Sequence, residues 1–192
     1  MIRAFVAVPL EDAVVRRRLA GARSLLPPLR GVRWVPETHL HFTVRFLGDV
    51  DGERLADLRA AVAEAARGGG PFRLSLAGLG AFPPRGPARV LWAGCGEGGD
   101  ALSTLASTVE EAFSRLGFPP EARPFSPHLT LARVKDVEAG RRLARALPTL
   151  PPEPFGDVDV SALVLFRSDL SPRGPDYTEL FRAELQPPPA LA

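Results

Sequence analysis

Four segments of the chain have apolar residues at helical spacing, and seven shorter stretches have the apolar and polar pattern of strands. The predicted helices are residues 13–26, 52–67, 100–116 and 137–147. The predicted strands are residues 3–8, 40–47, 72–79, 89–93, 128–134, 157–166 and 177–185. Because helices and strands do not alternate regularly, the order indicates an α+β fold rather than a parallel α/β sheet.

Glycine and proline mark the ends of these segments. Residues 68–70 are all glycine and follow the second predicted helix, and Gly117 follows the third, where a glycine commonly ends a helix. The final residues, 186–192, are rich in proline and are predicted to form a flexible tail. We therefore expect one folded unit over residues 1–185.

The composition is that of a globular protein without a membrane segment. The chain has 192 residues, of which 45% are hydrophobic, enough for one domain or for two small lobes that share a core. No apolar run approaches the roughly 20 residues that span a bilayer, and the first residues resemble a strand rather than a signal peptide. Cys95 is the only cysteine, which is typical of a reducing compartment. We expect a cytoplasmic monomer.

The charge balance limits how this protein attracts a polyanion. The formal net charge is only +2 at pH 7, so long-range attraction to nucleic acid is modest. Nearly all of the positive charge is arginine, whose planar fork suits bidentate contacts with phosphate. Any surface that binds nucleic acid must therefore be local.

The pattern His-x-Thr occurs twice, each time in a predicted strand. His41 is followed by Thr43 and His128 by Thr130, although the chain has only three histidines. Residues i and i+2 of a strand point to the same face. Each motif is therefore expected to present a histidine and a threonine on one face and apolar residues on the other. The repetition suggests two related half-domains whose polar pairs face each other across a cleft.

Two such pairs are suited to an in-line displacement at phosphorus. A neutral histidine takes a proton from the attacking water, and a protonated histidine gives a proton to the leaving oxygen; an imidazole pKa of about 6.5 suits both roles. Threonine hydroxyls hydrogen-bond the non-bridging oxygens as charge develops. This chemistry requires no metal and no other cofactor, and the sequence lacks the carboxylate cluster of a two-metal site.

Two arginines are candidate phosphate ligands. Arg45 continues the alternation that begins at His41, so we expect it on the cleft face. The parity of Arg133 relative to His128 places it on the opposite face, unless the strand ends or bulges before it. On periodicity alone, either arginine is equally compatible with a solvated surface charge.

Aromatic residues and the third histidine are weaker candidates. Phe5 and Trp34 have rings that can stack on a base, although aromatic residues in apolar segments usually belong to the core. His39 shares the predicted face of His41 but has no counterpart beside His128. We interpret His39 as a structural residue at the start of the strand.

Two stretches resemble the 2H phosphoesterase superfamily. They are Trp34-Val-Pro-Glu-Thr-His-Leu-His-Phe-Thr-Val-Arg-Phe-Leu-Gly48 and Pro127-His-Leu-Thr-Leu-Ala-Arg133. The chain is most similar to the RNA 2′,3′-cyclic phosphodiesterase branch, also called 2′-5′ RNA ligase (LigT/ThpR-like). The likeness extends from residues 3–8 at one end to residues 165–180 at the other, and so covers nearly the whole chain.

The resemblance implies a bilobal fold, with two pseudo-symmetric lobes of antiparallel sheet and outer helices around a central cleft. It implies opening of a 2′,3′-cyclic phosphate to a 2′-phosphate, with His128 as the base and His41 as the acid. Thr43 and Thr130 match the family's phosphate ligands. Arg133 matches the family's phosphate-binding arginine, which predicts that its strand is irregular or ends near residue 132.

The resemblance also implies RNA ends with 2′,3′-cyclic phosphates, including tRNA halves, as substrates. Cyclic nucleotides are an alternative substrate, and 2′-5′ ligation is the reverse reaction. Two other hypotheses remain open at this point. One is a non-catalytic protein that binds RNA ends. The other is a metal-dependent hydrolase that uses His39, His41 and His128 as zinc ligands.

Overall fold

A computed structural model of the protein describes residues 1–171 and 174–187. Its strands form two sheets in which every neighbouring pair is antiparallel. The four-stranded sheet has the order β3-β1-β8-β9, formed by His41–Val50, Ile2–Pro9, Ala162–Ser171 and Gly174–Glu184. The five-stranded sheet has the order β2-β6-β5-β4-β7, formed by Val32–Trp34, His128–Val134, Val90–Cys95, Phe72–Phe82 and Pro154–Val160.

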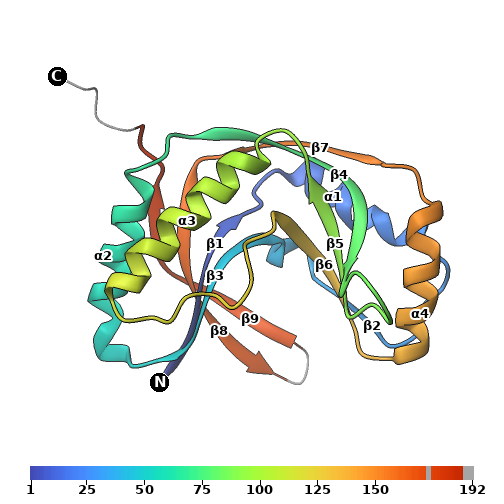
Figure 1. Ribbon diagram of the computed structural model, residues 1–192, viewed down its shortest axis with the longest axis horizontal. Helices are drawn as coiled ribbons and strands as arrows, with labels where there is room; N and C mark the ends of the chain where they lie inside the picture. The colour runs from blue at the N-terminus through green and yellow to red at the C-terminus, as the bar shows by residue number, and fades with distance from the viewer. Residues whose placement is uncertain (172–173, 188–192) are drawn as a thin grey trace.

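Helices cover each sheet on its outer side (Figure 1). The helices are α1 (Ala13–Gly21), α2 (Leu55–Ala66), α3 (Gly99–Arg115) and α4 (Val137–Ala146). Helices α2 and α3 pack against strands of the four-stranded sheet, whereas α1 and α4 contact strands of the five-stranded sheet. The molecule is therefore an α+β protein with two lobes, which confirms the predicted fold class.

The two lobes use their strands in a corresponding order. Starting from the strand that begins with a motif histidine, one sheet runs β3-β1-β8-β9 and the other β6-β5-β4-β7, with the short strand β2 added beside β6. Phe42 and Leu129, the middle residues of the two motifs, are fully buried. The histidine and threonine on either side of each are only partly buried. Each motif thus has an apolar side in the core and a polar side facing away from it, as the alternation predicts.

Aspartates fix the starts of two helices. The Asp12 carboxylate accepts hydrogen bonds from the backbone N–H groups of Val14 and Val15, and Asp136 accepts one from Ala139. These side chains satisfy N–H groups that have no partner within the helix. Both helices therefore begin where the sequence predicts, within one residue.

The structure corrects the predicted elements at several places. The predicted strand 157–166 is two strands, β7 and β8, which break at Ser161 and belong to different sheets. The predicted helix 13–26 is an α-helix followed by a 3-10 turn at Ala22–Leu25. Strand β2 has only three residues, too few to show a period, and was not predicted.

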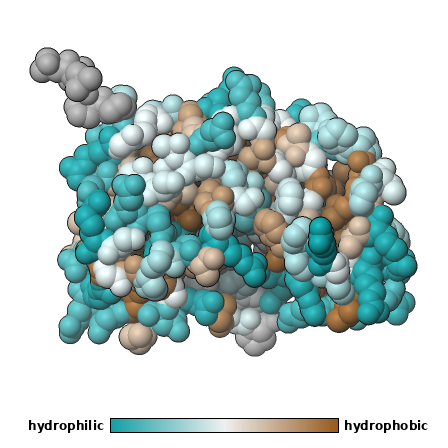
Figure 2. Space-filling view, viewed as in Figure 1, coloured by the Kyte–Doolittle hydropathy of each residue, from teal (hydrophilic) through white to brown (hydrophobic). Residues whose placement is uncertain are grey.

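The predicted tail, residues 186–192, lies mostly outside the described residues. Of it, only Gln186 and Pro187 are described, and the Gln186 N–H donates to the carbonyl of Ala66 at the end of α2. Most of the face seen in Figure 2 is hydrophilic, with hydrophobic residues grouped in its middle and on the side of α4. Within the described ranges, no helix has both the length and the apolar character needed to cross a membrane.

Candidate active site

His41 is the first residue of β3, and both of its ring nitrogens have a partner. Nδ1 lies 2.7 Å from the backbone oxygen of His39, and because a carbonyl only accepts, Nδ1 carries the proton and donates. Nε2 lies 3.0 Å from Oγ1 of Thr43. In the neutral ring Nε2 accepts from this hydroxyl. The motif thus holds the imidazole in one tautomer, with Nε2 and the threonine hydroxyl side by side.

His128 begins β6 and is held in the same way. Its Nδ1 lies 2.7 Å from the backbone oxygen of Ser126, which is again the residue two positions earlier. Nδ1 therefore donates, and Nε2 remains available as an acceptor in the neutral ring. The Nδ1 bond is the same at both histidines, and it leaves each Nε2 as the ring nitrogen that can exchange a proton with a bound molecule.

Aromatic rings surround both histidines. The rings of Phe5 and Tyr177 lie 5.0 Å and 5.3 Å from that of His41, Tyr177 edge-on. The rings of Phe82 and Trp92 lie 5.0 Å and 6.4 Å from that of His128. Apolar rings remove water from an imidazole and so disfavour its charged form.

The pKa values reflect this burial. Burial lowers the pKa of His41 from 6.5 to about 4; the charges of His39 and Arg133 lower it further, and the hydrogen bond to the His39 carbonyl opposes the shift. Burial also lowers the pKa of His128, with Arg133 acting in the same direction and the hydrogen bond to Ser126 opposing it. In the ligand-free protein at pH 7, His41 is therefore neutral.

Arg133 links the two motifs electrostatically, and the strand faces that carry their histidines are called the cleft faces below. Arg133, in the five-stranded sheet, lowers the pKa of both histidines. It also lowers the pKa of Tyr177, a residue of the four-stranded sheet, and so opposes the increase that burial causes there. Strands β3 and β6 contact each other directly, and the guanidinium of Arg33 on β2 lies beside Gly174 at the start of β9. One arginine thus acts on titratable groups from both lobes.

A β-bulge follows each motif at the same position. In β3, Thr43 pairs with Ala7 and Arg45 with Val6, so Val44 has no partner. In β6, Thr130 pairs with Trp92 and Ala132 with Leu91, so Leu131 has no partner. An extra residue reverses the alternation, so in each strand the fifth residue after the histidine returns to the cleft face.

The bulges determine that Arg133, and not Arg45, lies on the same face as the motif histidine of its strand. Arg133 is the fifth residue after His128, is exposed, and pairs in register with Arg33. The irregularity expected near residue 132 is therefore confirmed. In β3 the fifth residue after His41 is Phe46, whose side chain is 59% exposed. The pattern in the sequence had not singled out Phe46.

The expectation that Arg45 lies on the cleft face is wrong. Its side chain is buried, 3% exposed, because the bulge turns it toward α3. There it pairs with the carboxylate of Glu110 and donates to the carbonyl of Pro119 at 2.6 Å. Arg45 therefore attaches α3 to the sheet and is not available to a ligand in the cleft.

The two aromatic candidates also differ from the expectation. Phe5 is buried, 3% exposed, and its ring stacks on Phe166, so it supports His41 rather than offering a free face. Trp34 pairs with Ala132 on the outer face of the second sheet. Its ring lies under the guanidinium of Arg23 and lines a separate groove beside α4. Neither ring is placed to stack on a base at the histidines.

The sequence did not point to the aromatic residues that flank His128. Trp92 pairs with Thr130 and shares its face, and Phe82 lies against both Trp92 and His128. A side chain at Gly80 would overlap the Trp92 ring, so the glycine makes room for it. Strand pairing between distant segments brings these residues together, and no local pattern signals it.

The third histidine does not complete a metal site. His39 contacts the ring of Tyr177, and its backbone oxygen binds His41. Across residues 1–171 and 174–187, no three histidine, cysteine, aspartate or glutamate side chains are grouped as metal ligands. The arrangement gives the three-histidine hypothesis no support.

Comparison with known proteins identifies relatives that are similar in sequence and in fold. Residues 9–172 match the family model of the 2′-5′ RNA ligase superfamily. The chain is 36% identical over 180 residues to an RNA 2′,3′-cyclic phosphodiesterase of Methanothermobacter thermautotrophicus, covering 93% of this chain and 96% of that protein. Its fold is similar to that of TT0787 of Thermus thermophilus, with a TM-score of 0.81, 35% identity and coverage of 97% and 99%. E. coli LigT complexed with 3′-AMP is also similar, with a TM-score of 0.77, 29% identity and coverage of 96% and 98%.

Proposed function

The chain belongs to the 2′-5′ RNA ligase superfamily, and from this we propose that it hydrolyses 2′,3′-cyclic phosphates at RNA ends to 2′-phosphates. The observation that carries the proposal is the pair of His-x-Thr motifs, each with its Nδ1 held by a carbonyl. Both motifs border the space influenced by Arg133. Relatives named RNA 2′,3′-cyclic phosphodiesterase support the choice of substrate.

In the proposed reaction, water attacks phosphorus opposite the 3′ oxygen. His128 Nε2 takes the proton of the water as the new P–O bond forms. The bond between phosphorus and the 3′ oxygen breaks, and His41 Nε2–H gives its proton to that oxygen. The products are a 2′-phosphate and a free 3′-hydroxyl, and the next cycle needs a proton moved from His128 to His41. In both histidines Nε2 is the nitrogen left for this exchange, because the Nδ1 atoms are bonded to backbone oxygens.

Thr43, Thr130 and Arg133 are proposed to bind the phosphate. The two hydroxyls lie on the same strand faces as the histidines, and the bulge in β6 returns Arg133 to that face. These groups stabilise charge that develops on the non-bridging oxygens. No metal or other cofactor has a part in this proposal.

Substrate binding has to change the protonation of His41. Burial holds the pKa of His41 at about 4 in the ligand-free protein, so an acid role requires a bound anion that raises it. A cyclic phosphate carries one negative charge, and an opposite charge within hydrogen-bonding distance favours the protonated ring. We therefore propose that the substrate itself converts His41 into the acid.

The proposal is tested with a nucleoside 2′,3′-cyclic phosphate and a short RNA that ends in one. Phosphorus NMR should show conversion to the 2′-phosphate, with no effect of EDTA and no turnover of a 3′,5′-cyclic nucleotide. A 3′-phosphate product would refute the assigned roles of the two histidines. Binding of 2′-phosphorylated RNA without any turnover would instead identify a protein that only binds RNA ends.

Ligation is proposed as the reverse reaction. A 5′-hydroxyl would replace water at His128, and the 2′-5′ linkage would form as the cyclic phosphate opens. The abundance of water favours hydrolysis, so ligation is expected only at high concentrations of RNA ends, such as tRNA halves. We propose the cytoplasm as the location, which the single cysteine, Cys95, supports.

A further inference from the structure

A cavity of about 410 Å³ lies beside His41, within the range of about 300–1,000 Å³ for small-molecule pockets. Its apolar wall includes Leu10 and Leu40, and the rings of Phe166 and Tyr177 border it next to His41. Its remaining wall includes the charged residues Glu11, Arg16, Glu179 and Arg182. None of Thr43, His128 and Thr130 lines it. The cavity therefore adjoins the proposed phosphate position without being part of it.

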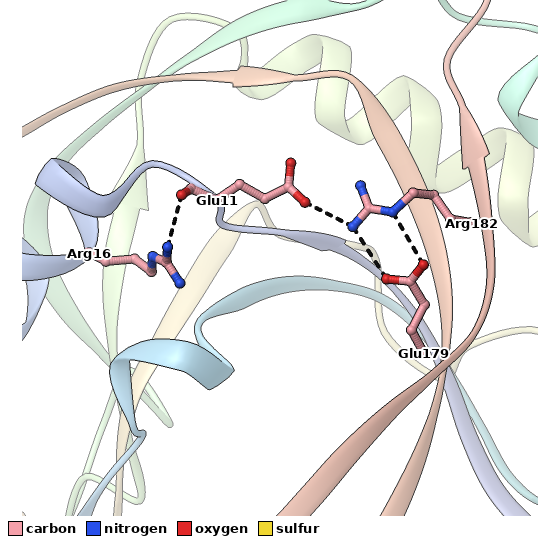
Figure 3. Close-up of polar contacts among 4 residues, drawn as sticks. All are labelled: Glu11, Arg16, Glu179 and Arg182. Carbon is pink, nitrogen blue, oxygen red and sulfur yellow. Dashed lines mark hydrogen bonds and ion pairs between the residues drawn. The ribbon is translucent and has the colours of Figure 1, made fainter.

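One part of the charged wall is an ion-pair network between β9 and the end of β1 (Figure 3). Arg182 lies 2.8 Å from the carboxylate of Glu11 and 3.3 Å from that of Glu179. Hydrogen bonds that Arg182 donates to the carboxylates of Glu179 and Glu11 raise its pKa. Because two carboxylates already balance this guanidinium, Arg182 organises the wall and is poorly suited to attract an anion.

Arg16 on α1 is in a different situation. Its Nη2 donates to the backbone oxygen of Glu11 at 3.0 Å, which holds the guanidinium at the cavity (Figure 3). The nearby Asp12 carboxylate is occupied by backbone N–H groups at the start of the helix. In the part of the chain that the structure describes, no carboxylate forms an ion pair with Arg16. A guanidinium has five N–H donors, so Arg16 brings a fixed positive charge with free donors to the cavity.

The position of the cavity indicates which part of a substrate would enter it. In the proposed reaction, His41 touches the 3′ oxygen, so the ribose of the terminal nucleotide lies on the His41 side. Water approaches on the His128 side. The RNA continues from the 5′ carbon of that ribose and is therefore directed toward the hollow beside His41.

We propose that this cavity binds the nucleotide immediately upstream of the cyclic-phosphate nucleotide. This inference rests on the proposed function. Arg16 contacts the phosphate between the two nucleotides, and Phe166 and Tyr177 contact the upstream sugar and base. The enzyme consequently recognises an RNA end over at least two nucleotides, and it uses dinucleotides better than mononucleotides.

The test compares kcat/KM for a cyclic mononucleotide and for a dinucleotide with the same cyclic end. The wild type should prefer the dinucleotide about tenfold or more, the usual effect of a hydrogen bond to a charged group. Arg16→Ala should remove this preference and leave kcat/KM for the mononucleotide unchanged, and Arg16→Lys should keep part of it. Arg17→Ala is the matched control, because this neighbouring arginine is exposed and does not line the cavity.

Each outcome decides the inference. Equal values for both substrates in the wild type would overturn it, and so would an Arg16→Ala variant that loses the same factor on both. A loss of preference in Arg17→Ala as large as in Arg16→Ala would show that only the overall charge of α1 matters. If the wild type hydrolyses neither substrate, the proposed function fails and this inference fails with it, whereas hydrolysis of the dinucleotide alone would be the extreme form of the expected preference.

Discussion

His41 and His128 begin their strands with the same bond from Nδ1 to the backbone oxygen two residues earlier, yet the structure surrounds them differently. His41 lies among Phe5, Phe166 and Tyr177, and His39 is a further neighbour that lowers its pKa. His128 contacts Phe82 and Trp92. Five residues after each histidine, the bulges place an exposed phenylalanine in one lobe and an arginine in the other.

This difference shows how a repeated scaffold produces an asymmetric site. The motifs and bulges are equivalent, so both lobes present a histidine and a threonine at corresponding positions. Arg133 supplies positive charge from one lobe, whereas Phe46 offers an apolar face from the other. The cavity adjoins only His41. The phosphate is thus expected nearer the charged lobe, and the nucleoside nearer the aromatic one.

The largest effect is expected from removing either histidine. His41→Ala and His128→Ala should each lower kcat by about 10²- to 10⁴-fold, the usual contribution of a general acid or base. The double variant should lose far less than the product of the two single losses, because the pair acts as a unit. Turnover is measured with a cyclic mononucleotide, and circular dichroism checks the fold. Substantial activity in either single variant would contradict the mechanism.

Exchanging the residues after the bulges tests the asymmetry directly. Arg133→Ala should lower kcat/KM about 10²- to 10³-fold, as for other donors to a developing anion, and Arg133→Lys should recover part of the loss. Phe46→Arg in the Arg133→Ala background should recover little, because the charge would then come from the wrong lobe. Arg141→Ala, an exposed arginine of α4, is the control. Full rescue by Phe46→Arg would mean that the lobes are interchangeable.

The free energy of unfolding should decrease at acidic pH because His41 is buried in its neutral form. Its pKa is about 4 in the folded protein and near the ordinary 6.5 when unfolded. Between these values only the unfolded chain binds the proton, so stability is present above pH 6.5 and is lost as the pH falls. The loss from this group should reach about 3 kcal/mol near pH 4. Urea unfolding of the wild type and His41→Asn at pH 8 and pH 4 measures it. An equal decrease in both proteins would show that His41 is not held neutral.

The smallest effect is expected at Phe46. Phe46→Ala should raise KM about tenfold with little change in kcat, because base stacking on an aromatic side chain contributes about 1–3 kcal/mol to binding. Phe46→Tyr should behave like the wild type. Val137→Ala, an exposed apolar residue of α4, controls for general surface effects. A decrease in kcat without a change in KM would place Phe46 in the chemistry instead of in binding.

The sequence by itself determined the helices, most of the strands and the polar face of each motif. These features repeat with a short local period, so Phe42 and Leu129 were assigned to the core correctly. The resemblance added Arg133, which local alternation had placed on the wrong face. The roles of the individual site residues remain predictions for the experiments above.

Only the tertiary structure decided where the alternation breaks. Val44 and Leu131 bulge because their strands pair with β1 and β5, which are distant in the sequence. The bulge in β3 buries Arg45. After each bulge, Phe46 and Arg133 return to the face that carries the motif histidine. The same long-range pairing divides residues 154–171 between two sheets. It also brings Trp92 to His128. A period-2 pattern records which residues alternate along one strand, whereas the register between strands depends on contacts that no local segment contains.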